Sequence, residues 1–485
     1  MKIERIKPLA ANIGVMSVGL DTYWAQFPGL LDEMKRKSDI LVQRLRRRSL
    51  TVTDFGMIDN AERAYEALPK LKAADLDALF VDMVTYATSA TFGAIVRAMD
   101  CPVVLVALQP LKAMQYEVGT TFMQLSNDDI CSIPEFTGVA IRMGRPVADV
   151  IIGTLDDDPA AEAAIDDWCR IAQARHDLRK ARIGHMGHVL EAMLDMQTDV
   201  TALTAAFGCH AVQCEPDEIL VEFSPLAADD PAVKAMAERI LAFFDTPTPV
   251  SDPLTTTLTE ADLLLASRAA VALERFIAKK RLDGFAYYYE APPDSEMRTL
   301  VTNFCVGNSL LTAAGFPMCG EFDIKTCVAM LVMDRLEIGG SFAEFHPVDF
   351  IRESVLVGHD GPHHLNIADG KPVIRSLRKY HGKPGKGAGV EFSIKTGPIT
   401  LLSIGSKADG SFKFVLAEGE SLPGPIPPTG NTNTHGRFPP DVRTFLRRWC
   451  LEGPTHHFAL GVGHHAATIA KLAASFGVEA VITTL

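Results

Sequence analysis

The chain has 485 residues, of which 47% are hydrophobic and 22% are charged. A chain of this length is too long for one hydrophobic core, so about two to four domains are expected. Its net charge of −13 offers no basic surface for nucleic acid or anionic lipid, which argues against both kinds of partner. The composition therefore predicts a large, soluble, multidomain protein.

The cysteines and the start of the sequence both predict a cytoplasmic protein. The nine cysteines form no C-x-x-C pair and lie mostly in apolar surroundings, as reduced thiols of cytosolic proteins do. The first twenty residues, "MKIERIKPLAANIGVMSVGL", lack the apolar core and cleavage site of a signal peptide. The uncharged segment 299–320 contains Asn, Gly and Pro residues that make it a poor membrane span, so we expect it to be buried inside the protein.

Strand and helix patterns alternate in the first part of the chain. Residues 12–20, "NIGVMSVGL", predict a buried strand, and helical spacing follows over 27–45. Apolar runs at 77–86 and 102–108 each follow a helical pattern, which favours a parallel sheet flanked by helices. The Asp-Pro pair at 158–159 predicts the start of a helix of about twenty residues that leads out of this domain.

The alternation starts again after this helix and then changes. Strand and helix patterns continue from "KARIGHMG" at 180–187 to "GFAYYYE" at 284–290. Beyond about residue 338, short alternating runs such as "ITLLSIG" and "SFKFVLAEG" are typical of antiparallel strands, and Asp409-Gly410 between these two is typical of a hairpin turn. The polar segment 431–440, "NTNTHGRFPP", is expected to form a loop, and a helix and a strand are expected to close the chain.

The predicted fold is α/β. It has two tandem Rossmann-like parallel-sheet domains at 1–158 and 159–337, followed by a mainly antiparallel, barrel-like β domain at 338–485. No G-x-G-x-x-G follows the first strand, which argues against a dinucleotide-binding enzyme.

Carboxylates and histidines stand near predicted element ends in the last third of the chain, where functional sites are commonly built. Mixed carboxylate and imidazole ligands suit Mn²⁺, Fe²⁺, Co²⁺ or Zn²⁺. Spacing alone leaves two interpretations of Glu321 open: it is a metal ligand, or it is an acid that stabilises the start of a helix. Asp323 is expected to cap that helix or to orient Lys325. The candidates are Glu321 in "CGEFDIKT", Glu344 in "GGSFAEF", His359 in "VLVGHD" and the pair His456-His457 in "GPTHHF".

The order and context of these residues resemble the L-arabinose isomerase and L-fucose isomerase superfamily. "GEFDIKT" resembles the segment with the first catalytic glutamate, "GGSFAEF" the segment with the second acidic ligand, and "VLVGHD" the segment with a histidine ligand in the arabinose enzymes. The resemblance implies that Glu321 and Glu344 are an acid–base pair and metal ligands, and that His359 and a second histidine complete the metal shell.

The closing segment "GPTHHFALGVGHHAATIAKLAASFGVEAVIT" resembles the His-His segment of the same superfamily. The resemblance places the last ligand on His457, with His456, His464 and His465 as alternatives. In a strand, His456 and His457 would point to opposite faces, so only one of them is expected to bind metal.

The N-terminal string "GLDTYWAQFPGL" resembles the segment in which these isomerases place substrate-contacting residues. A loop at a helix start, with the Tyr and Trp packed against the protein, is the alternative interpretation. The resemblance further implies Mn²⁺ as the usual ion, with Mg²⁺, Co²⁺ or Fe²⁺ as substitutes, and a homotrimer or homohexamer with sites at subunit interfaces. The residues implied to bind substrate are Asp21, Tyr23, Trp24 and Gln26.

The function implied by the resemblance is a metal-dependent aldose–ketose isomerase that works through an enediolate, on a sugar that the sequence does not specify. A divalent ion stabilises the charge that develops when the weakly acidic C2 proton leaves, and two carboxylates can serve as base and acid. A metal-dependent epimerase or an oxidoisomerase on a sugar acid or branched sugar is an alternative, because one such site supports several outcomes. A non-catalytic sugar-binding protein is the alternative from another class.

Overall fold

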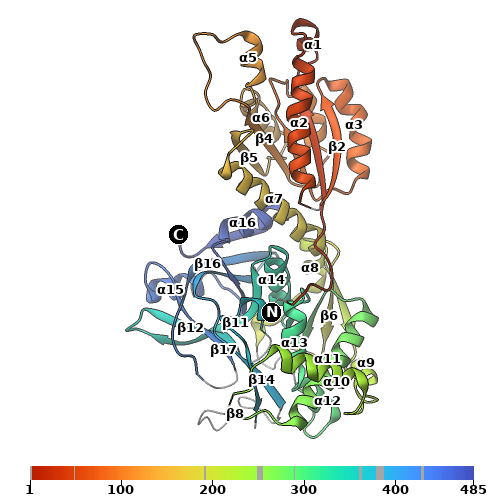
Figure 1. Cartoon of the computed structure of the whole chain (residues 1–485), viewed down its shortest axis with the longest axis vertical. Coiled ribbons are helices and arrows are strands. Elements are labelled where there is room, and N and C mark those ends of the chain that lie inside the picture. The colour runs from red at the N-terminus through yellow and green to blue at the C-terminus, as the bar shows by residue number, and fades with distance from the viewer. Residues whose placement is uncertain are drawn as a thin grey trace. The chain divides into compact units, whose positions relative to one another are not determined.

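The computed structural model describes residues 3–48, 50–189, 193–247, 255–288, 290–359, 363–377, 387–427 and 431–485. The chain divides into two compact units, one formed by Leu9–Asp177 and the other by Met1–Pro8 together with Leu178–Leu485. The first unit runs from red to yellow in Figure 1, and most of the second from yellow-green to blue.

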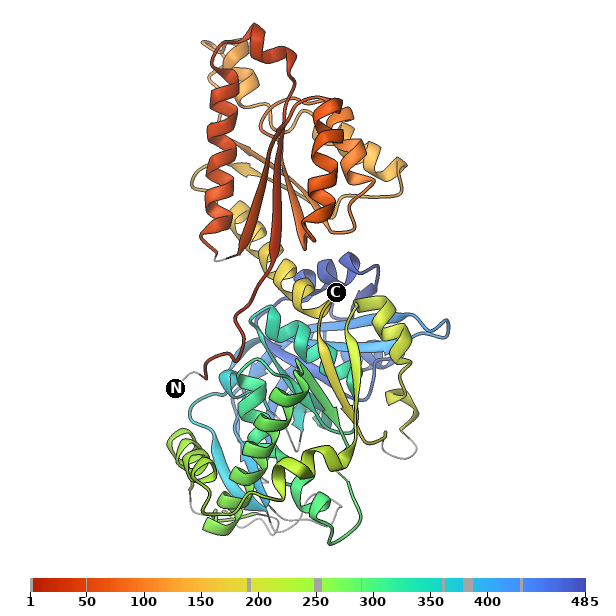
Figure 2. The same cartoon turned by 90° about the vertical axis from the view of Figure 1, so that its right-hand side faces the viewer.

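The unit 9–177 is built on a five-stranded sheet with the order β2-β1-β3-β4-β5, in which every pairing is parallel. The inner strands β1, β3 and β4 are almost wholly buried because helices cover both faces, which explains their continuous apolar sequences. Figure 2 shows α2 and α3 on opposite faces of this sheet. The strands are β1 (Asn12–Val18), β2 (Thr51–Ile58), β3 (Ala78–Asp82), β4 (Val103–Gln109) and β5 (Asp149–Thr154).

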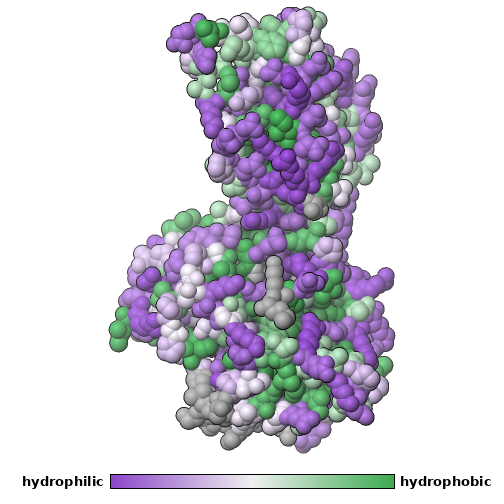
Figure 3. All heavy atoms as spheres, viewed as in Figure 1, coloured by the Kyte–Doolittle hydropathy of each residue, from purple (hydrophilic) through white to green (hydrophobic). Residues whose placement is uncertain are grey.

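The helices of this unit follow the predicted alternation. The helix predicted to begin at the Asp-Pro pair is confirmed as α7, which has 20 residues. The Asp158 carboxylate accepts the backbone N–H groups of Ala160 and Ala161 at its start. Hydrophilic side chains predominate over α2 and α3 on the face shown in Figure 3. The helices are α1 (Thr22–Gln26), α2 (Leu30–Arg46), α3 (Ala61–Ala73), α4 (Ala90–Val96), α5 (Thr121–Ser126), α6 (Ile133–Arg142) and α7 (Pro159–Leu178).

The second unit begins with another parallel sheet, of order β10-β9-β6-β7. The uncharged segment is buried as expected, since all residues of α13 are buried. Within the described residues, no helix is both long and apolar enough to span a membrane. The strands are β6 (Arg182–Met186), β7 (His210–Cys214), β9 (Gly284–Tyr287) and β10 (Met318–Cys319). The helices are η1 (Leu194–Met196), α8 (Val200–Phe207), α9 (Pro216–Phe223), α10 (Pro231–Phe243), α11 (Glu260–Lys280), α12 (Glu296–Val301) and α13 (Phe304–Ala313).

A closed antiparallel barrel follows. Its strands run in the order β15-β18-β11-β12-β17-β16, and pairing of β15 with β16 closes the ring. The hairpin predicted at Asp409-Gly410 joins β15 to β16, but the loop predicted at 431–440 was wrong, because most of that segment is β17 inside the barrel. The strands are β11 (Gly339–Asp349), β12 (Ser354–His359), β15 (Gly397–Ser406), β16 (Phe412–Leu422), β17 (Thr432–Arg437) and β18 (Phe458–Val462).

The closing helix and strand are also as expected, and β19 adds to β16 in parallel at the edge of the barrel. A small sheet of order β14-β13-β8 pairs a strand before residue 338 with two strands after it. The division into three domains at 158 and 337 stays a prediction. The remaining elements are α15 (Val442–Leu451), α16 (Ala466–Ser475), β19 (Glu479–Ile482), β8 (Thr255–Thr256), β13 (Val373–Leu377), β14 (Gly387–Glu391) and η2 (Leu365–Ile367).

Helix α14 (Ile324–Arg335) joins the two layers of this unit. All twelve of its residues are buried, because it packs against β9 and β10 of the parallel sheet and against β11, β15 and β18 of the barrel. The run CVAMLVM within this helix is apolar on every side, as such a position requires. Its first turn therefore lies where the carboxyl end of the parallel sheet meets the barrel.

Candidate metal and acid–base site

The loop between β10 and α14 carries Glu321 in an unusual backbone conformation. Glu321 has φ 60° and Phe322 has φ 63°, so two successive non-glycine residues lie in the left-handed region. Such conformations cost on the order of 1–3 kcal/mol each and persist where the surroundings hold them. Contacts with residues outside the loop therefore hold this backbone conformation and, with it, the direction of the Glu321 side chain.

His185, at the end of β6, provides those contacts. Its ring stacks on the Phe322 ring with centroids 3.4 Å apart and planes at 14°. Its Nε2 atom lies 3.3 Å from the Phe322 carbonyl, and the Phe322 N–H donates to the carbonyl of Tyr287 at 3.0 Å. Burial lowers the pKa of His185 to about 4, so its ring is neutral at physiological pH. The parallel sheet therefore fixes the residue next to Glu321.

Asp323 caps α14 and also holds His457. Its carboxylate accepts the N–H of Thr326 at 3.0 Å and the Thr326 hydroxyl at 2.8 Å, which confirms the predicted cap. It also lies 3.0 Å from Nδ1 of His457. Burial alone would raise the pKa of Asp323, but the hydrogen bond and charge of His457 lower it. An ionised Asp323 can only accept, so Nδ1 of His457 donates to it, and the neutral tautomer with its proton on Nδ1 has its lone pair on Nε2.

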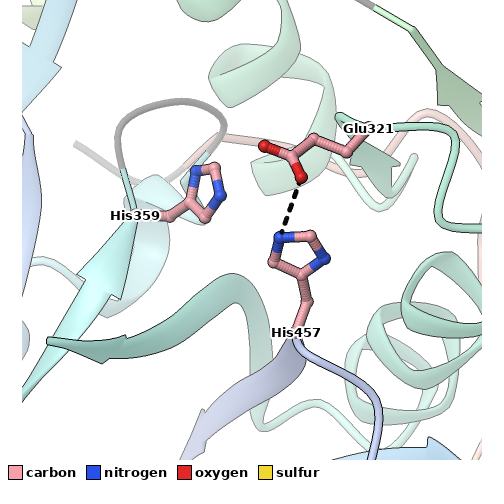
Figure 4. A group of neighbouring side chains, drawn as sticks. All are labelled: Glu321, His359 and His457. Atoms are coloured by element: carbon pink, nitrogen blue, oxygen red, sulfur yellow. Dashed lines mark ion pairs between the residues drawn. The ribbon is translucent and has the colours of Figure 1, made fainter. Parts of the chain in front are cut away.

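His457 faces Glu321 and His359 (Figure 4). The His457 side chain is fully buried, and its Nε2 atom has no hydrogen-bond partner among the described residues. That atom lies 3.5 Å from a Glu321 carboxylate oxygen, and the rings of His457 and His359 have centroids 5.3 Å apart. The three side chains come from the β10–α14 loop, the end of β12 and the residue before β18. They form a buried pair of imidazoles with one carboxylate.

Glu344 joins the same group from β11. One of its carboxylate oxygens is 2.6 Å from Nε2 of His456, and the other is 4.0 Å from Nε2 of His359 and 3.8 Å from His346. Burial alone would raise the pKa of Glu344, but the hydrogen bond from His456 and the nearby imidazoles lower it to about 2. Glu344 is therefore an ionised carboxylate at neutral pH.

Burial also fixes the protonation state of His359. It lowers the pKa of this imidazole well below its ordinary value, more than Glu344 raises it. The Phe342 ring lies 4.4 Å from the rings of both His359 and His457, which gives the two imidazoles one apolar wall. A neutral His359 can donate a lone pair to a cation.

The donor set fits a divalent metal ion. Glu321, His359 and His457 each offer a ligand atom, and these atoms lie within 4.8 Å of one another; Glu344, His456 and His457 form a second such group. Two carboxylates with two imidazoles suit Mn²⁺, Fe²⁺, Co²⁺ or Zn²⁺. The unpartnered, buried Nε2 of His457 and the oriented Nδ1 behind it are what a metal-ligating histidine needs.

The two histidines of the pair do not behave as expected. The expectation that they point to opposite faces of a strand was wrong, because β18 begins only at Phe458 and the rings of His456 and His457 lie 4.7 Å apart. The second histidine pair lies elsewhere: His464 is 3.1 Å from the carbonyl of Gly419, and His465 is the residue before α16.

A chain of bonds that the sequence did not reveal supports this end of the site. Nζ of the buried Lys325 donates to the carbonyl of Asp195 at 2.5 Å, rather than being oriented by Asp323. The Asp195 carboxylate accepts the backbone N–H of His456 at 2.7 Å. Asp195 lies in η1, more than one hundred residues from its partners, so only the fold could show this contact.

The predicted substrate-binding residues lie in the other compact unit, 9–177, at the start of α1. The Trp24 Nε1–H donates to the buried carboxylate of Asp59 at 2.7 Å, and Tyr23 packs edge-on against Phe27. These contacts agree with the packed alternative for the two aromatic residues. Asp21 accepts the side-chain amide of Asn60 at 3.0 Å, whereas Gln26 is exposed. The substrate role of the four residues stays a prediction.

A separate cavity of about 940 Å³ lies at the other end of α14. Its lining includes Asp334 and Arg5, whose guanidinium donates to that carboxylate at 3.1 and 2.6 Å. The four predicted metal ligands do not line this cavity. The size of this cavity therefore does not identify the site. The buried Nε2 of His457, which lacks a hydrogen bond among the described residues, and the carboxylates of Glu321 and Glu344 identify it.

Comparison with known proteins gives distant relatives of one kind. The chain is 25% identical over 374 residues to an L-arabinose isomerase of Nocardioides sp., which covers 76% of this chain and 72% of the relative. It is 24% identical over 359 residues to an L-arabinose isomerase of Shewanella sp. (strain ANA-3), covering 72% and 68% of the two chains. For an L-arabinose isomerase of Klebsiella pneumoniae the identity is 22% over 334 residues, covering 67% and 64%. No protein-family model matches the chain.

Proposed function

This chain is a divergent member of the superfamily that contains the L-arabinose isomerases, and from that premise we propose that it is a metal-dependent aldose–ketose isomerase. The observation that carries the proposal is the convergence of Glu321, Glu344, His359 and His457 from four separate parts of the chain. The relatives are named as isomerases of L-arabinose, which is an aldose, and a site with two carboxylates and two imidazoles suits aldose–ketose isomerisation.

The residues that would hold the ion are Glu321, Glu344, His359 and His457. A bound divalent ion supplies Lewis-acid polarisation of the sugar oxygens at C1 and C2. The oriented Nε2 of His457 and the neutral His359 provide two nitrogen donors, and the carboxylates provide the oxygen donors. Mn²⁺ is the proposed ion, with Mg²⁺, Co²⁺ or Fe²⁺ as substitutes, because oxygen and nitrogen sites discriminate poorly among them.

The two glutamates divide the proton transfers of the reaction. One carboxylate removes the proton from C2 to give an enediolate, and the other transfers the proton that moves between O1 and O2. Glu344 is kept ionised by His456, and His456 is half-exposed, so this pair can exchange a proton with solvent. On the side of the site away from His456, the buried residues around His359 and His457 exclude water and strengthen the electrostatic interactions.

The proposed partner is a small sugar, and the proposed assembly is a homotrimer or homohexamer with sites at subunit interfaces. In such an assembly, Asp21, Tyr23, Trp24 and Gln26 would contact the sugar. Size-exclusion chromatography with light scattering tests the assembly, since a monomer that retains full activity contradicts it.

Hydrogen–deuterium exchange tests the proposed chemistry. The purified protein is incubated with a panel of aldoses and Mn²⁺ in D₂O, and loss of the C2 proton signal is followed by NMR. Exchange that EDTA abolishes is the expected result, and it identifies the sugar class at the same time. A protein that exchanges no C2 proton but binds a sugar saturably would contradict the isomerase and support a sugar-binding protein.

A further inference from the structure

Arg298 on α12 is a buried arginine with unsatisfied side-chain donors. The residue is 8% exposed, and its Nε and Nη1 atoms are inaccessible and have no hydrogen-bond partner among the described residues. Other buried arginines of this unit pair directly: Arg375 donates to Glu391 at 3.2 and 3.3 Å, and Arg335 donates to Asp334. Buried donors without hydrogen-bond partners are costly, so their presence calls for an explanation.

Glu290 forms an ion pair with this guanidinium but no hydrogen bond. An oxygen of Glu290 lies 3.9 Å from Nη1 of Arg298, which is too long for a hydrogen bond. The other oxygen of Glu290 accepts the hydroxyl of Tyr288 at 3.1 Å, and the Glu290 side chain is 32% exposed. Nε and Nη1 of Arg298 therefore keep donors for a group that is not part of the described chain.

Short contacts connect Arg298 to the metal and acid–base site. Tyr288 directly follows β9, and the carbonyl of the preceding residue, Tyr287, accepts the N–H of Phe322. The peptide before Tyr288 thus lies beside the peptide after Glu321. Burial raises the pKa of the Tyr288 hydroxyl to about 12, and the charges of both Arg298 and Glu321 act on that hydroxyl. Arg298, Tyr288 and Glu321 consequently share one region at the carboxyl end of the parallel sheet, where α/β proteins bind ligands.

We propose that Arg298 binds an anionic group, a carboxylate or a phosphate, at the end of the sugar remote from C1 and C2. This inference rests on the proposed function, because it takes the reacting end of the sugar to lie at Glu321 and Glu344. A planar guanidinium with free donors matches a carboxylate or phosphate in two-point hydrogen bonding. The substrate class is then an aldose with a terminal acid group, such as a uronic acid or a sugar phosphate, and not a neutral pentose.

Matched pairs of sugars separate charge from stereochemistry. C2 exchange in D₂O with Mn²⁺ is measured for galactose and galacturonate, for glucose and glucuronate, and for arabinose and its terminal phosphate ester. The anionic member of at least one pair should show a kcat/KM about 10- to 100-fold higher, the gain expected from a hydrogen bond to a charged group. Preference for uronic acids over the phosphate ester identifies a carboxylate as the ligand, and the reverse identifies a phosphate.

The variant Arg298→Met tests the residue itself. It should raise KM for the anionic sugar about 10- to 100-fold, with kcat largely retained, and leave neutral sugars unaffected. Its melting temperature should not fall, because buried donors without hydrogen bonds are removed; loss of a structural arginine would instead lower stability. Arg275→Met, on the exposed side of α11, removes the same charge and should change neither quantity.

The outcomes distinguish this inference from the proposed function. Exchange of neutral sugars at rates equal to their anionic counterparts, unaffected by Arg298→Met, overturns the inference and leaves the isomerase in place. If no sugar of either kind exchanges, the isomerase fails, and calorimetric titration with galacturonate and the phosphate ester decides this inference alone. Saturable binding that Arg298→Met abolishes then supports an anion site, and equal or absent binding in both proteins overturns it.

Discussion

Replacing Asp323 with Asn separates the two tasks of this carboxylate. One oxygen accepts the N–H of Thr326 as the cap of α14, and the other accepts from His457 Nδ1 at 3.0 Å. Asn is as good a cap as Asp, so the helix start is retained. Its NH₂ group, however, would face Nδ1 of His457 as a donor, which favours the tautomer with the proton on Nε2. That tautomer has no lone pair on Nε2, the atom that faces the proposed metal site.

The expected loss follows from the role of such an outer partner. Removing it typically costs about 10- to 100-fold in metal affinity, which corresponds to about 1.4–2.7 kcal/mol. We expect Asp323→Asn to bind Mn²⁺ that much more weakly in calorimetric titration, with a melting temperature in EDTA within a few degrees of the wild type. Thr326→Val is the matched control, because it removes the hydroxyl bond at 2.8 Å and leaves the contact with His457 in place. Unchanged Mn²⁺ affinity in Asp323→Asn would refute the orientation of His457 by this carboxylate.

Three further predictions concern other parts of the second unit. Asp334→Asn removes the negative charge that pairs with Arg5 and Arg335 and should cost about 3–5 kcal/mol in urea denaturation at neutral pH. Burial alone would raise the pKa of Asp334, but His364 and these two arginines lower it below its usual value. The contribution of Asp334 to stability is therefore present above about pH 4 and is lost as pH falls toward the pKa of the folded protein. The variant should lose less stability in acid than the wild type, and an unchanged dependence of stability on pH would contradict this. Gly358→Ala places a Cβ 2.0 Å from the carbonyl of Thr432. This change should lower stability by about 1–3 kcal/mol and weaken Mn²⁺ binding through the adjacent His359. Gly370→Ala, whose Cβ would meet open space, should leave Mn²⁺ affinity unchanged, and equal affinities in both variants would contradict this. Because burial lowers the pKa of His359 and that of Glu344 is about 2, Mn²⁺ affinity should fall little between about pH 7 and pH 6. A loss of about threefold or more over that step in calorimetry, as an imidazole with the ordinary pKa of about 6.5 would give, would contradict this.

Local patterns were sufficient for most of the fold. The buried strands β1, β3 and β4 are continuous apolar runs, and α7 begins at an Asp-Pro cap, so the sequence alone located them. Strand β2 was not recognised, because it lies at the sheet edge and most of its residues remain partly exposed. The polar sequence "TNTHGR" of β17 predicts a loop, yet the backbone of this strand pairs with β12 and β16 to complete the barrel. Pairing partners, not propensity, decide such a strand.

The candidate site divides in the same way. The segments around Glu321, Glu344 and His457 were located through strings that resemble a known superfamily, and the fold brings them together. The contacts that orient them were not accessible from the sequence, since they join residues far apart in the chain: Asp195 with His456, and His185 with Phe322. The Asp323 cap was visible as a local signal, but its bond to His457 was not. Long-range hydrogen bonds have no sequence period that could predict them.

The most direct test of the proposed isomerase compares wild type and Glu321→Gln in the C2 exchange experiment with Mn²⁺. Gln has the shape of Glu but cannot take up a proton, so the variant should keep its fold and lose nearly all exchange. We predict rapid, EDTA-sensitive exchange in the wild type and a loss of about 10²-fold or more in Glu321→Gln, the usual contribution of a general base. Exchange at the wild-type rate in Glu321→Gln, with the same sugar and ion, would contradict the role of Glu321 and the mechanism built on it.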